Sequence, residues 1–342
     1  MKRIDYDTAV RDQPSALERA HRSIAHALAE SAIEPWRAGD TVAVVAMGAS
    51  THSAHALVFA LLGSGVRAFS LTASDASLCA PDTQPADHYV IVSESGRSPE
   101  PIEAARRFTP GRRIGITNVA DSPLAAEVDV VLPLGDVDDS GVYTVGYTAT
   151  LLAYAMLCEH VIGMPVGDTA AIPARVASAL SSFDGGAQIV AERLSAARTV
   201  DFVGRGTSLA AASEGALMFR EALALPTAAF DTYQYLHGPM EPLREHSALV
   251  VFGDERELSL VDSVLDSGVQ VCLVTQRPLA DLARPNHENL VVISIAADVA
   301  GFERSIHEAL VPQLIVGHAA ARMGRRPGEF TYRQPDTKIP IS

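Results

Sequence analysis

Two stretches of the chain share one pattern, and this repeat limits the fold more than any other feature. TVAVVAMGAS at 41–50 and TVDFVGRGTS at 199–208 are each a short apolar segment followed by a glycine-containing turn and a helical pattern. In both halves, further apolar segments alternate with helical ones, which is typical of parallel sheets covered by helices on both faces. We therefore predict an α/β chain of two tandem, doubly wound parallel-sheet domains.

The predicted boundary lies in VIGMPVGDTAAIP at 161–173, where Gly, Pro and Asp interrupt the pattern. This gives domains of 1–165 and 166–342. We expect Ser98 to be the N-cap of its helix, with Pro99 at the first helical position. The predicted strands lie within residues 41–50, 66–71, 86–93, 112–118, 128–134, 199–208, 247–255, 269–276 and 289–297, and the helices within 15–33, 51–65, 98–108, 143–163, 173–197, 207–225 and 303–324.

Charge and composition exclude several classes of function. The formal net charge is −14, and such a surface repels an extended polyanion, so no nucleic-acid partner is expected. A small phosphorylated ligand stays open, because backbone N–H groups at a helix N-terminus can bind it. Cys79, Cys158 and Cys272 match no zinc spacing and are too few for a disulfide scaffold. The N-terminus has no long apolar segment and no run approaches a membrane span, so we predict a cytoplasmic protein with no membrane partner.

Two loops at predicted strand ends carry small polar residues. The turn MGAS contains Gly48 and Ser50, and SESGRS at 93–98 offers three hydroxyl groups around a glycine. Hydroxyl and N–H groups at a helix N-terminus can hold a phosphate without a lysine. Serine- and glycine-rich loops are also common as plain turns, so the residues alone leave both interpretations open.

These loops resemble those of the SIS (sugar isomerase) domain family, whose domains are flavodoxin-like. MGAS stands where family members carry CGTS, SESGRS where they carry SQSGET, and GVYTVG at 141–146 where they carry GVASTK. The resemblance implies binding of a phosphorylated sugar, and no metal or organic cofactor. The residues implied in that binding are Gly48, Ser50, Ser93, Glu94 (in place of the family's glutamine), Ser95, Ser98, Val142 and Thr144. The equivalent loop of the second half reads FGDERE, whose acids would repel phosphate, so one phosphate site per chain is expected.

The second half carries the motifs with the more specific resemblance. EGALMFRE at 214–221 and HGP at 237–239 match the family's EGALKLKE and HGP. The resemblance implies that Glu221 transfers a proton between C1 and C2 and that His237 opens the sugar ring. It also implies that Lys338, in the C-terminal tail, closes over the substrate and can form a Schiff base. From the residues alone, these could equally be a solvated helix glutamate, a turn histidine and an exposed tail lysine.

Departures from the family pattern limit the predicted activity. Met218 and Gly146 stand where the family has lysines, and the chain shows no glutaminase domain. We therefore expect a deaminase that releases ammonia or an amine from a phosphorylated amino sugar. The alternatives are a plain phosphosugar aldose–ketose isomerase and a non-catalytic sugar-phosphate sensor. The resemblance also implies a homodimer in which His237 reaches the site of the neighbouring chain.

Three other groups of side chains were weighed as sites. His52 and His55 could suggest a metal pair, but no third ligand follows in the sequence, so ordinary helix residues near the site are favoured. The acidic stretch DVDDSG at 136–141 is predicted to be a solvated loop. Tyr233 and Tyr235, close to His237, either line a pocket or pack.

Overall fold

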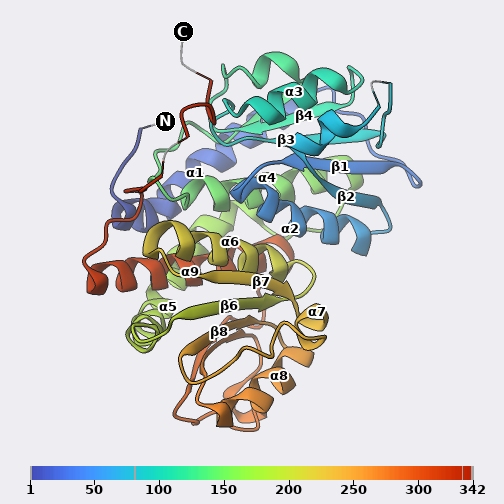
Figure 1. Ribbon diagram of the computed structural model, residues 1–342. Coiled ribbons are helices and arrows are strands. Elements are labelled where there is room, and N and C mark those ends of the chain that lie inside the picture. The colour runs from blue at the N-terminus through green and yellow to red at the C-terminus, as the bar shows by residue number, and fades with distance from the viewer. Residues whose placement is uncertain (1, 81, 333, 340–342) are drawn as a thin grey trace.

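A computed structural model describes residues 2–80, 82–332 and 334–339, and it contains two five-stranded parallel sheets (Figure 1). The order in the first sheet is β2 (Arg67–Thr72), β1 (Thr41–Ala46), β3 (His88–Val92), β4 (Arg113–Thr117) and β5 (Val130–Pro133). The second sheet has the order β7 (Thr227–Asp231), β6 (Thr199–Gly204), β8 (Ser247–Phe252), β9 (Gln270–Thr275) and β10 (Leu290–Ser294). In the first sheet β1 lies between β2 and β3, and in the second sheet β6 lies between β7 and β8 in the same way. The prediction of two tandem doubly wound α/β units is confirmed.

Helices form a layer between the sheets and cover their outer faces (Figure 1). The α-helices are α1 (Tyr6–Glu30), α2 (Ala49–Gly63), α3 (Pro99–Arg107), α4 (Val145–Ile162), α5 (Ile172–Leu194), α6 (Ser208–Leu223), α7 (Thr232–Leu236), α8 (Arg256–Val264) and α9 (Gly301–Met323). In the middle layer α2 packs on α6, and α9 packs on α4, α5 and α6. One hydrophobic core therefore runs from the first sheet through this layer to the second. Because the halves share this layer, the domain boundary near residue 165 remains a prediction.

The helix α4 is the most buried of the long helices. Within the described residues it is the one helix long and apolar enough to cross a membrane, and most of it lies inside the protein. This corrects the expectation that no apolar run of the chain approaches the length of a membrane-spanning helix. Its apolar residues are explained by its position between two sheets, because a helix covered on all sides is apolar all round.

One strand and two helices of the second half were missing from the prediction. The strand β7 has the sequence TAAFD and lies at an edge of its sheet. It has no Val or Ile run, and most of its side chains are only half-buried, so its local pattern is weak. The short helix α7 follows it directly, and α8 covers the outer face below. Both halves therefore hold five strands, where the pattern predicted only four in the second.

Candidate active site

The carboxyl ends of β1 and β3 bring two of the predicted loops together. In the register of these neighbouring strands Ala46 pairs with Val92. The turn at Gly48 and the loop that begins at Ser93 therefore leave the sheet side by side. The strand order reverses at this point, since β2 lies on the other side of β1. Ligands of open parallel sheets bind at such switch points, so both loops lie where a ligand is expected.

The loop at 93–98 is shaped by its own backbone. The Gly96 N–H donates to the Ser93 carbonyl at 2.8 Å, and the Asn118 N–H donates to the Glu94 carbonyl at 2.8 Å. Gly96 has a φ of +60°, and a Cβ atom there would lie 2.0 Å from Oγ of Ser122. A side chain would therefore be strained by the backbone and would also clash, so the loop requires glycine.

Several hydroxyl groups around this loop are free to bind a ligand. Ser93 Oγ and Thr51 Oγ1 are buried and have no hydrogen-bond partner in the part of the chain that the structure describes. Ser98 is the N-cap of α3, followed by Pro99 as predicted, but its hydroxyl does not cap the helix. Ser50 lies in the first turn of α2. Buried polar groups without partners are costly unless a ligand satisfies them, and hydroxyls at two helix N-termini suit an anion.

The C-terminal tail lies against the same loop. The ammonium group of Lys338 donates to Oγ of Ser95 and to Oγ of Ser98, both at 3.0 Å. The Ile339 N–H donates to the Arg97 carbonyl at 2.9 Å, and Nε of Arg97 donates to the Ile339 carbonyl at 2.7 Å. Burial lowers the pKa of Lys338, while nearby Glu94 acts in the opposite direction. The structure thus places the tail lysine at the hydroxyls of the serine loop.

Glu94 is buried and lies close to Gly146. Its Oε1 accepts a hydrogen bond from Nδ2 of Asn118 at 3.2 Å. Burial, and then the charge of Asp139, raise the pKa of Glu94 to about 7. A Cβ atom on Gly146 would lie 2.8 Å from Cγ of Glu94. The two departures from the family pattern at these positions are therefore coupled: the Glu94 side chain fills space that any larger residue at 146 would need.

Asp139 holds the loop that leads into α4. Its carboxylate accepts hydrogen bonds from the Thr144 hydroxyl at 2.6 Å, the Gly146 N–H at 2.8 Å and the Ser140 N–H at 2.7 Å. Thr144 is buried and committed to this contact, and Val142 is buried as well. The prediction of a solvated loop at 136–141 is wrong for Asp139, because a carboxylate with several donors can be buried at a helix start.

Glu221 lines a cavity of about 1080 Å³ together with Lys338, Arg3 and Gly141. Its pKa is raised to about 7, first by burial and then by the negative charge of Glu214. Glu221 is therefore not a fully solvated helix residue. A carboxyl group with a pKa near neutral can both accept and return a proton, which is what a proton-transferring residue needs.

Glu214 and His52 connect the two halves of the molecule, and the charge of Glu214 acts on Glu221. Glu214 is fully buried in α6, and its Oε2 lies 3.1 Å from Nδ1 of His52 in α2. Burial raises the pKa of Glu214, and the hydrogen bond to His52 opposes this shift. His52 is thus bound to a carboxylate. Among residues 2–80, 82–332 and 334–339, no group of three or more His, Cys, Asp or Glu side chains could hold a metal ion.

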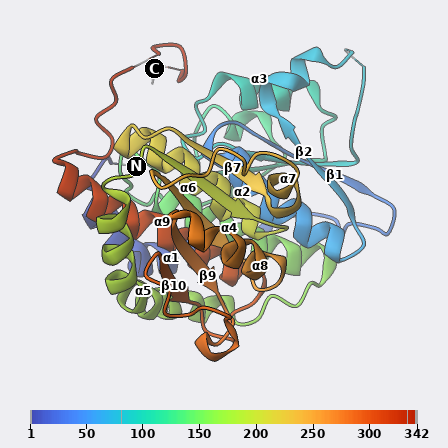
Figure 2. The ribbon, with the colours of Figure 1, turned by 60° about the horizontal axis from the view of Figure 1, so that its bottom comes forward.

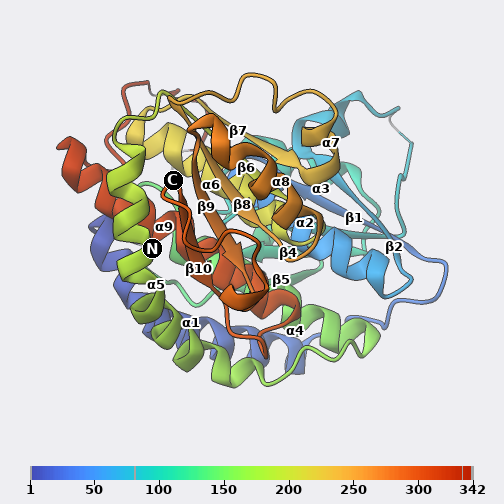
Figure 3. The same ribbon diagram turned by 90° about the horizontal axis from the view of Figure 1, so that it is seen from below.

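Of the three predicted catalytic residues, His237 is the one that does not line the cavity of Glu221 and Lys338. It follows α7 and is exposed. Figures 1, 2 and 3 show α7 away from the dark red C-terminal tail. Of its two tyrosine neighbours, Tyr235 is buried and donates to Asp201 at 2.8 Å. Tyr233 is exposed beneath the guanidinium of Arg205.

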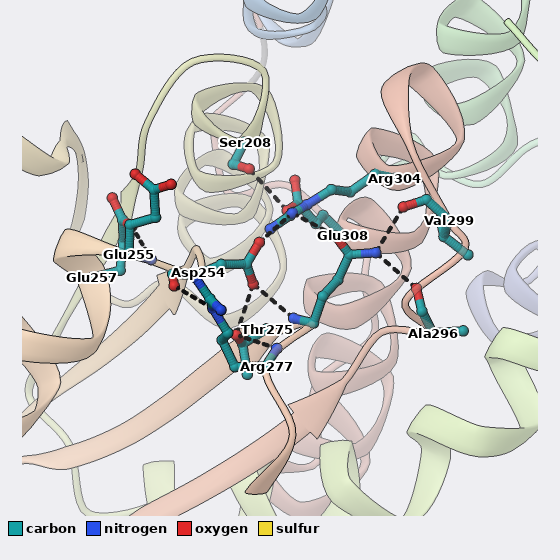
Figure 4. A network of polar contacts seen from close by, with 11 residues as sticks. Ser208, Asp254, Glu255, Glu257, Thr275, Arg277, Ala296, Val299, Arg304 and Glu308 are labelled. Atoms are coloured by element: carbon teal, nitrogen blue, oxygen red, sulfur yellow. Dashed lines mark hydrogen bonds and ion pairs between the residues drawn. The ribbon is translucent and has the colours of Figure 1, made fainter. Parts of the chain in front are cut away.

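In the equivalent region of the second half, polar side chains are joined by ion pairs and hydrogen bonds (Figure 4). Arg304 forms ion pairs with Asp254 and, at 2.9 Å, with Glu308. Glu308 also accepts a hydrogen bond from Ser208 at 2.8 Å, and Asp254 accepts one from Thr275 at 2.8 Å. The half-buried Arg304 is thus paired with two carboxylates. The expectation that the FGDERE loop binds no phosphate remains a prediction.

Sequence reasoning missed three residues that help to build the site. Arg97 lies within SESGRS, and its place in that motif could have marked it as a site residue. Asp139 and Arg3 meet through pairing of the N-terminal residues with the loop before α4, including an Ile4 N–H donated to the Asp139 carbonyl at 3.0 Å. The Arg3 guanidinium also lies 5.3 Å above the ring of Tyr143. No local sequence pattern encodes a contact between residues so far apart in the chain.

Comparison with known families identifies the class of this fold and site. A family profile described as SIS domain matches residues 37–160 and again 193–323. These segments make up most of the chain, and the chain belongs to the SIS domain family. Both matched segments contain a complete sheet, in agreement with two tandem copies of the domain.

Individual relatives are more distant. The chain is 27% identical over 258 residues to a glutamine–fructose-6-phosphate aminotransferase (isomerizing) of Bradyrhizobium diazoefficiens, covering 70% of this chain and 42% of that protein. The chain thus spans about two fifths of the length of this curated relative. Its fold is similar to that of a glucosamine-6-phosphate deaminase of Thermotoga maritima, with a TM-score of 0.76, 19% identity and coverage of 96% and 98% of the two chains. It is equally similar to the tagatose-6-phosphate ketose/aldose isomerase of Escherichia coli, with a TM-score of 0.76, 16% identity and coverage of 98% and 95%.

Proposed function

We propose that the protein is a phosphosugar isomerase-type enzyme that deaminates a phosphorylated amino sugar. The observation that carries this proposal is that one cavity holds both Glu221, with a pKa raised to about 7, and Lys338, which contacts the serine loop. A proton-transferring carboxyl group and an anion-binding loop are the two parts that this reaction needs. Family membership and the aminosugar-related names of the relatives support the same class.

In the proposed reaction the serine loop holds the phosphate, and Glu221 acts on the open-chain sugar. Glu221 removes the proton from C2 of a 2-amino-2-deoxyaldose phosphate and returns it to C1. A second proton passes from the nitrogen to the C1 oxygen, so the C1 aldehyde becomes an alcohol and the carbon that bears the amine becomes an imine. Water adds to the imine and ammonia leaves, so the products are a ketose phosphate and ammonia. Partial burial of Glu221 suits both proton transfers, because its acid and base forms coexist near neutral pH.

Ring opening is assigned to His237 of a second chain. Histidine can shuttle a proton near neutral pH, and His237 in this chain does not line the cavity of Glu221. We therefore propose a homodimer in the cytoplasm in which each chain lends its His237 to the other. An active monomer in gel filtration would contradict this arrangement.

The second candidate is a phosphosugar isomerase that acts on a substrate without an amine. One observation favours it: Met218, which stands where the family has a lysine, is apolar and fully buried. Transfer of a proton between C1 and C2 needs only Glu221 and the serine loop. Both candidates thus use the same residues and differ in whether ammonia is released.

The test is to incubate the protein with glucosamine 6-phosphate and to follow ammonia and fructose 6-phosphate in the same tube. We expect equal amounts of both products, and a loss of about 10²–10⁴-fold in kcat for Glu221→Gln. Glu18→Gln, on the exposed face of α1, is the matched control and should keep full activity. Interconversion of aldose and ketose phosphates without any ammonia would favour the second candidate. An unaffected Glu221→Gln variant would contradict both.

A further inference from the structure

We propose that Lys338 is a phosphate-binding residue, whose ammonium group forms part of the phosphate site with Ser95 and Ser98. This inference rests on the proposed function and assigns the tail lysine a role other than Schiff-base formation. The ammonium group contacts both hydroxyls at 3.0 Å, so it lies where a negatively charged ligand of this loop would bind.

The hydrogen bonds of Ser95 show how the lysine prepares the loop. A hydroxyl group has two acceptor lone pairs and one O–H donor. Oγ of Ser95 accepts from the Arg97 N–H at 3.3 Å and from Lys338 at 3.0 Å. Both lone pairs are then used, and only the O–H remains for another partner. Lys338 thus turns the Ser95 hydroxyl into a donor, which is what an anionic phosphate oxygen requires.

The hydrogen bonds of Lys338 leave one of its N–H donors for a phosphate. A protonated lysine carries three N–H donors, and two of them are directed at Ser95 and Ser98. The third can donate to a phosphate oxygen shared with those serines. Schiff-base formation instead requires a neutral amine whose lone pair is directed at a sugar carbonyl. The contacts with Ser95 and Ser98 hold the lysine nitrogen at the serine loop, which is where the phosphate would bind.

The position of Lys338 is fixed by the contacts of the next residue, Ile339. The Arg97 backbone and guanidinium both bind Ile339, the residue after Lys338. The Ile339 side chain packs against the hydrophobic cluster on the α3 face of the first sheet. The loop that binds the anion therefore also anchors the tail that supplies the cation. We expect phosphate binding and ordering of the tail to strengthen each other.

The composition of the chain makes this residue unusually easy to test. Of the 27 basic Lys and Arg residues, Lys2 and Lys338 are the only lysines. Lys2 is exposed in the N-terminal segment. Any amine-specific chemistry on a lysine side chain therefore has two targets, and Lys2→Met is a matched control for Lys338→Met.

The first experiment measures binding by titration calorimetry, with fructose 6-phosphate and with inorganic phosphate as probes. We expect Lys338→Met to weaken both by at least about tenfold, the size of a lost charge-assisted contact, and Lys2→Met to bind like the wild type. Equal binding by the wild type and Lys338→Met would overturn this inference and leave the proposed function intact. A wild type that binds neither probe would overturn the proposed function, and this inference with it.

The second experiment separates phosphate binding from covalent catalysis. The full-length protein is treated with borohydride in the presence of fructose 6-phosphate and digested for mass spectrometry. We expect no sugar adduct on Lys338, since the proposed role involves no covalent bond. A reduced adduct on Lys338 that is absent from Lys338→Met would overturn the assignment and support the Schiff-base role.

Discussion

The two halves of the molecule share one topology but differ in what lies at the carboxyl ends of their strands. In the first half, the loop after β3 leaves the hydroxyl of Ser93 buried and without a described partner. Its cation, Lys338, comes from the distant C-terminal tail. In the second half, Arg304 on α9 is paired with Asp254 and Glu308. The same fold thus holds a buried hydroxyl without a described partner at these strand ends in one copy, and an ion-pair cluster in the other.

The difference shows that a ligand site depends on which polar groups the protein leaves unsatisfied. Position at a switch point is common to both halves. The cation of the second half interacts with two carboxylates of its own half, so a phosphate would have to compete with them. In the first half the hydroxyls can only gain by binding a ligand. Polar residues of the second half should therefore contribute to stability, and those of the first half to binding.

The largest expected effect is on the second-half cluster. Arg304→Met leaves Asp254 and the fully buried Glu308 without their cation, and we expect a loss of about 3–5 kcal/mol in the free energy of unfolding. Chemical denaturation measures it. The control is Arg322→Met on the same helix, which removes an exposed ion pair with Glu192 and should cost less than about 1 kcal/mol.

A substitution in the serine loop of the first half should change ligand binding more than stability. Ser95→Ala should change the free energy of unfolding by about 1 kcal/mol or less, because it removes hydrogen bonds without leaving a buried charge, while sugar-phosphate affinity falls. If Ser95→Ala destabilised the protein as strongly as Arg304→Met and left binding unchanged, the contrast between the two halves would be wrong.

A loss of stability smaller than that of Arg304→Met is expected where Glu94 and Gly146 meet. Gly→Ala in a helix ordinarily stabilises a protein by about 0.5–1 kcal/mol. Gly146→Ala should instead destabilise it by about 1–3 kcal/mol, because the new Cβ would lie 2.8 Å from Cγ of Glu94. Gly185→Ala in α5, where nothing lies within 4 Å of the new Cβ, is the control and should stabilise. Adding Glu94→Ala to Gly146→Ala should recover part of the loss, and no recovery would show that the clash lies elsewhere.

Most of the fold could be predicted from the sequence, because its strands are apolar runs closed by glycine turns. β7 could not, since TAAFD is an edge strand with half-buried side chains. The serine loop and Glu221 were found through motifs, and the structure brings Glu221 and Lys338 to one cavity. The pairing of Glu94 with Gly146, and of Arg3 with the Asp139 loop, depends on contacts between distant segments. His237 depends on a second chain and remains a prediction.

The last contrast concerns the dependence of stability on pH, and it compares Glu221 with Asp254. The pKa of Glu221 is raised from 4.5 to about 7, mainly by burial. Between these values the unfolded chain has lost the proton that the folded protein keeps, so the contribution of Glu221 to stability falls as pH rises from about 4.5 to 7. Burial raises the pKa of Asp254, but the hydrogen bonds from Arg304, Gln276 and Thr275, together with the charge of Arg304, outweigh it and hold the pKa below 3.8. Its contribution is present above that pH and is lost as the pH falls further.

Denaturation of the wild type and Glu221→Gln from pH 4.5 to 8 checks this sign. The variant should gain stability relative to the wild type as the pH rises through this range, since it has no carboxyl group to ionise. Glu214→Gln should act on the same group, because the charge of Glu214 raises the pKa of Glu221. The rise of kcat/KM with pH should then begin at a lower pH in Glu214→Gln. A constant difference between wild type and Glu221→Gln at all pH values would mean that Glu221 ionises as freely as an exposed glutamate, and that its cavity has no carboxyl group that holds a proton near neutral pH.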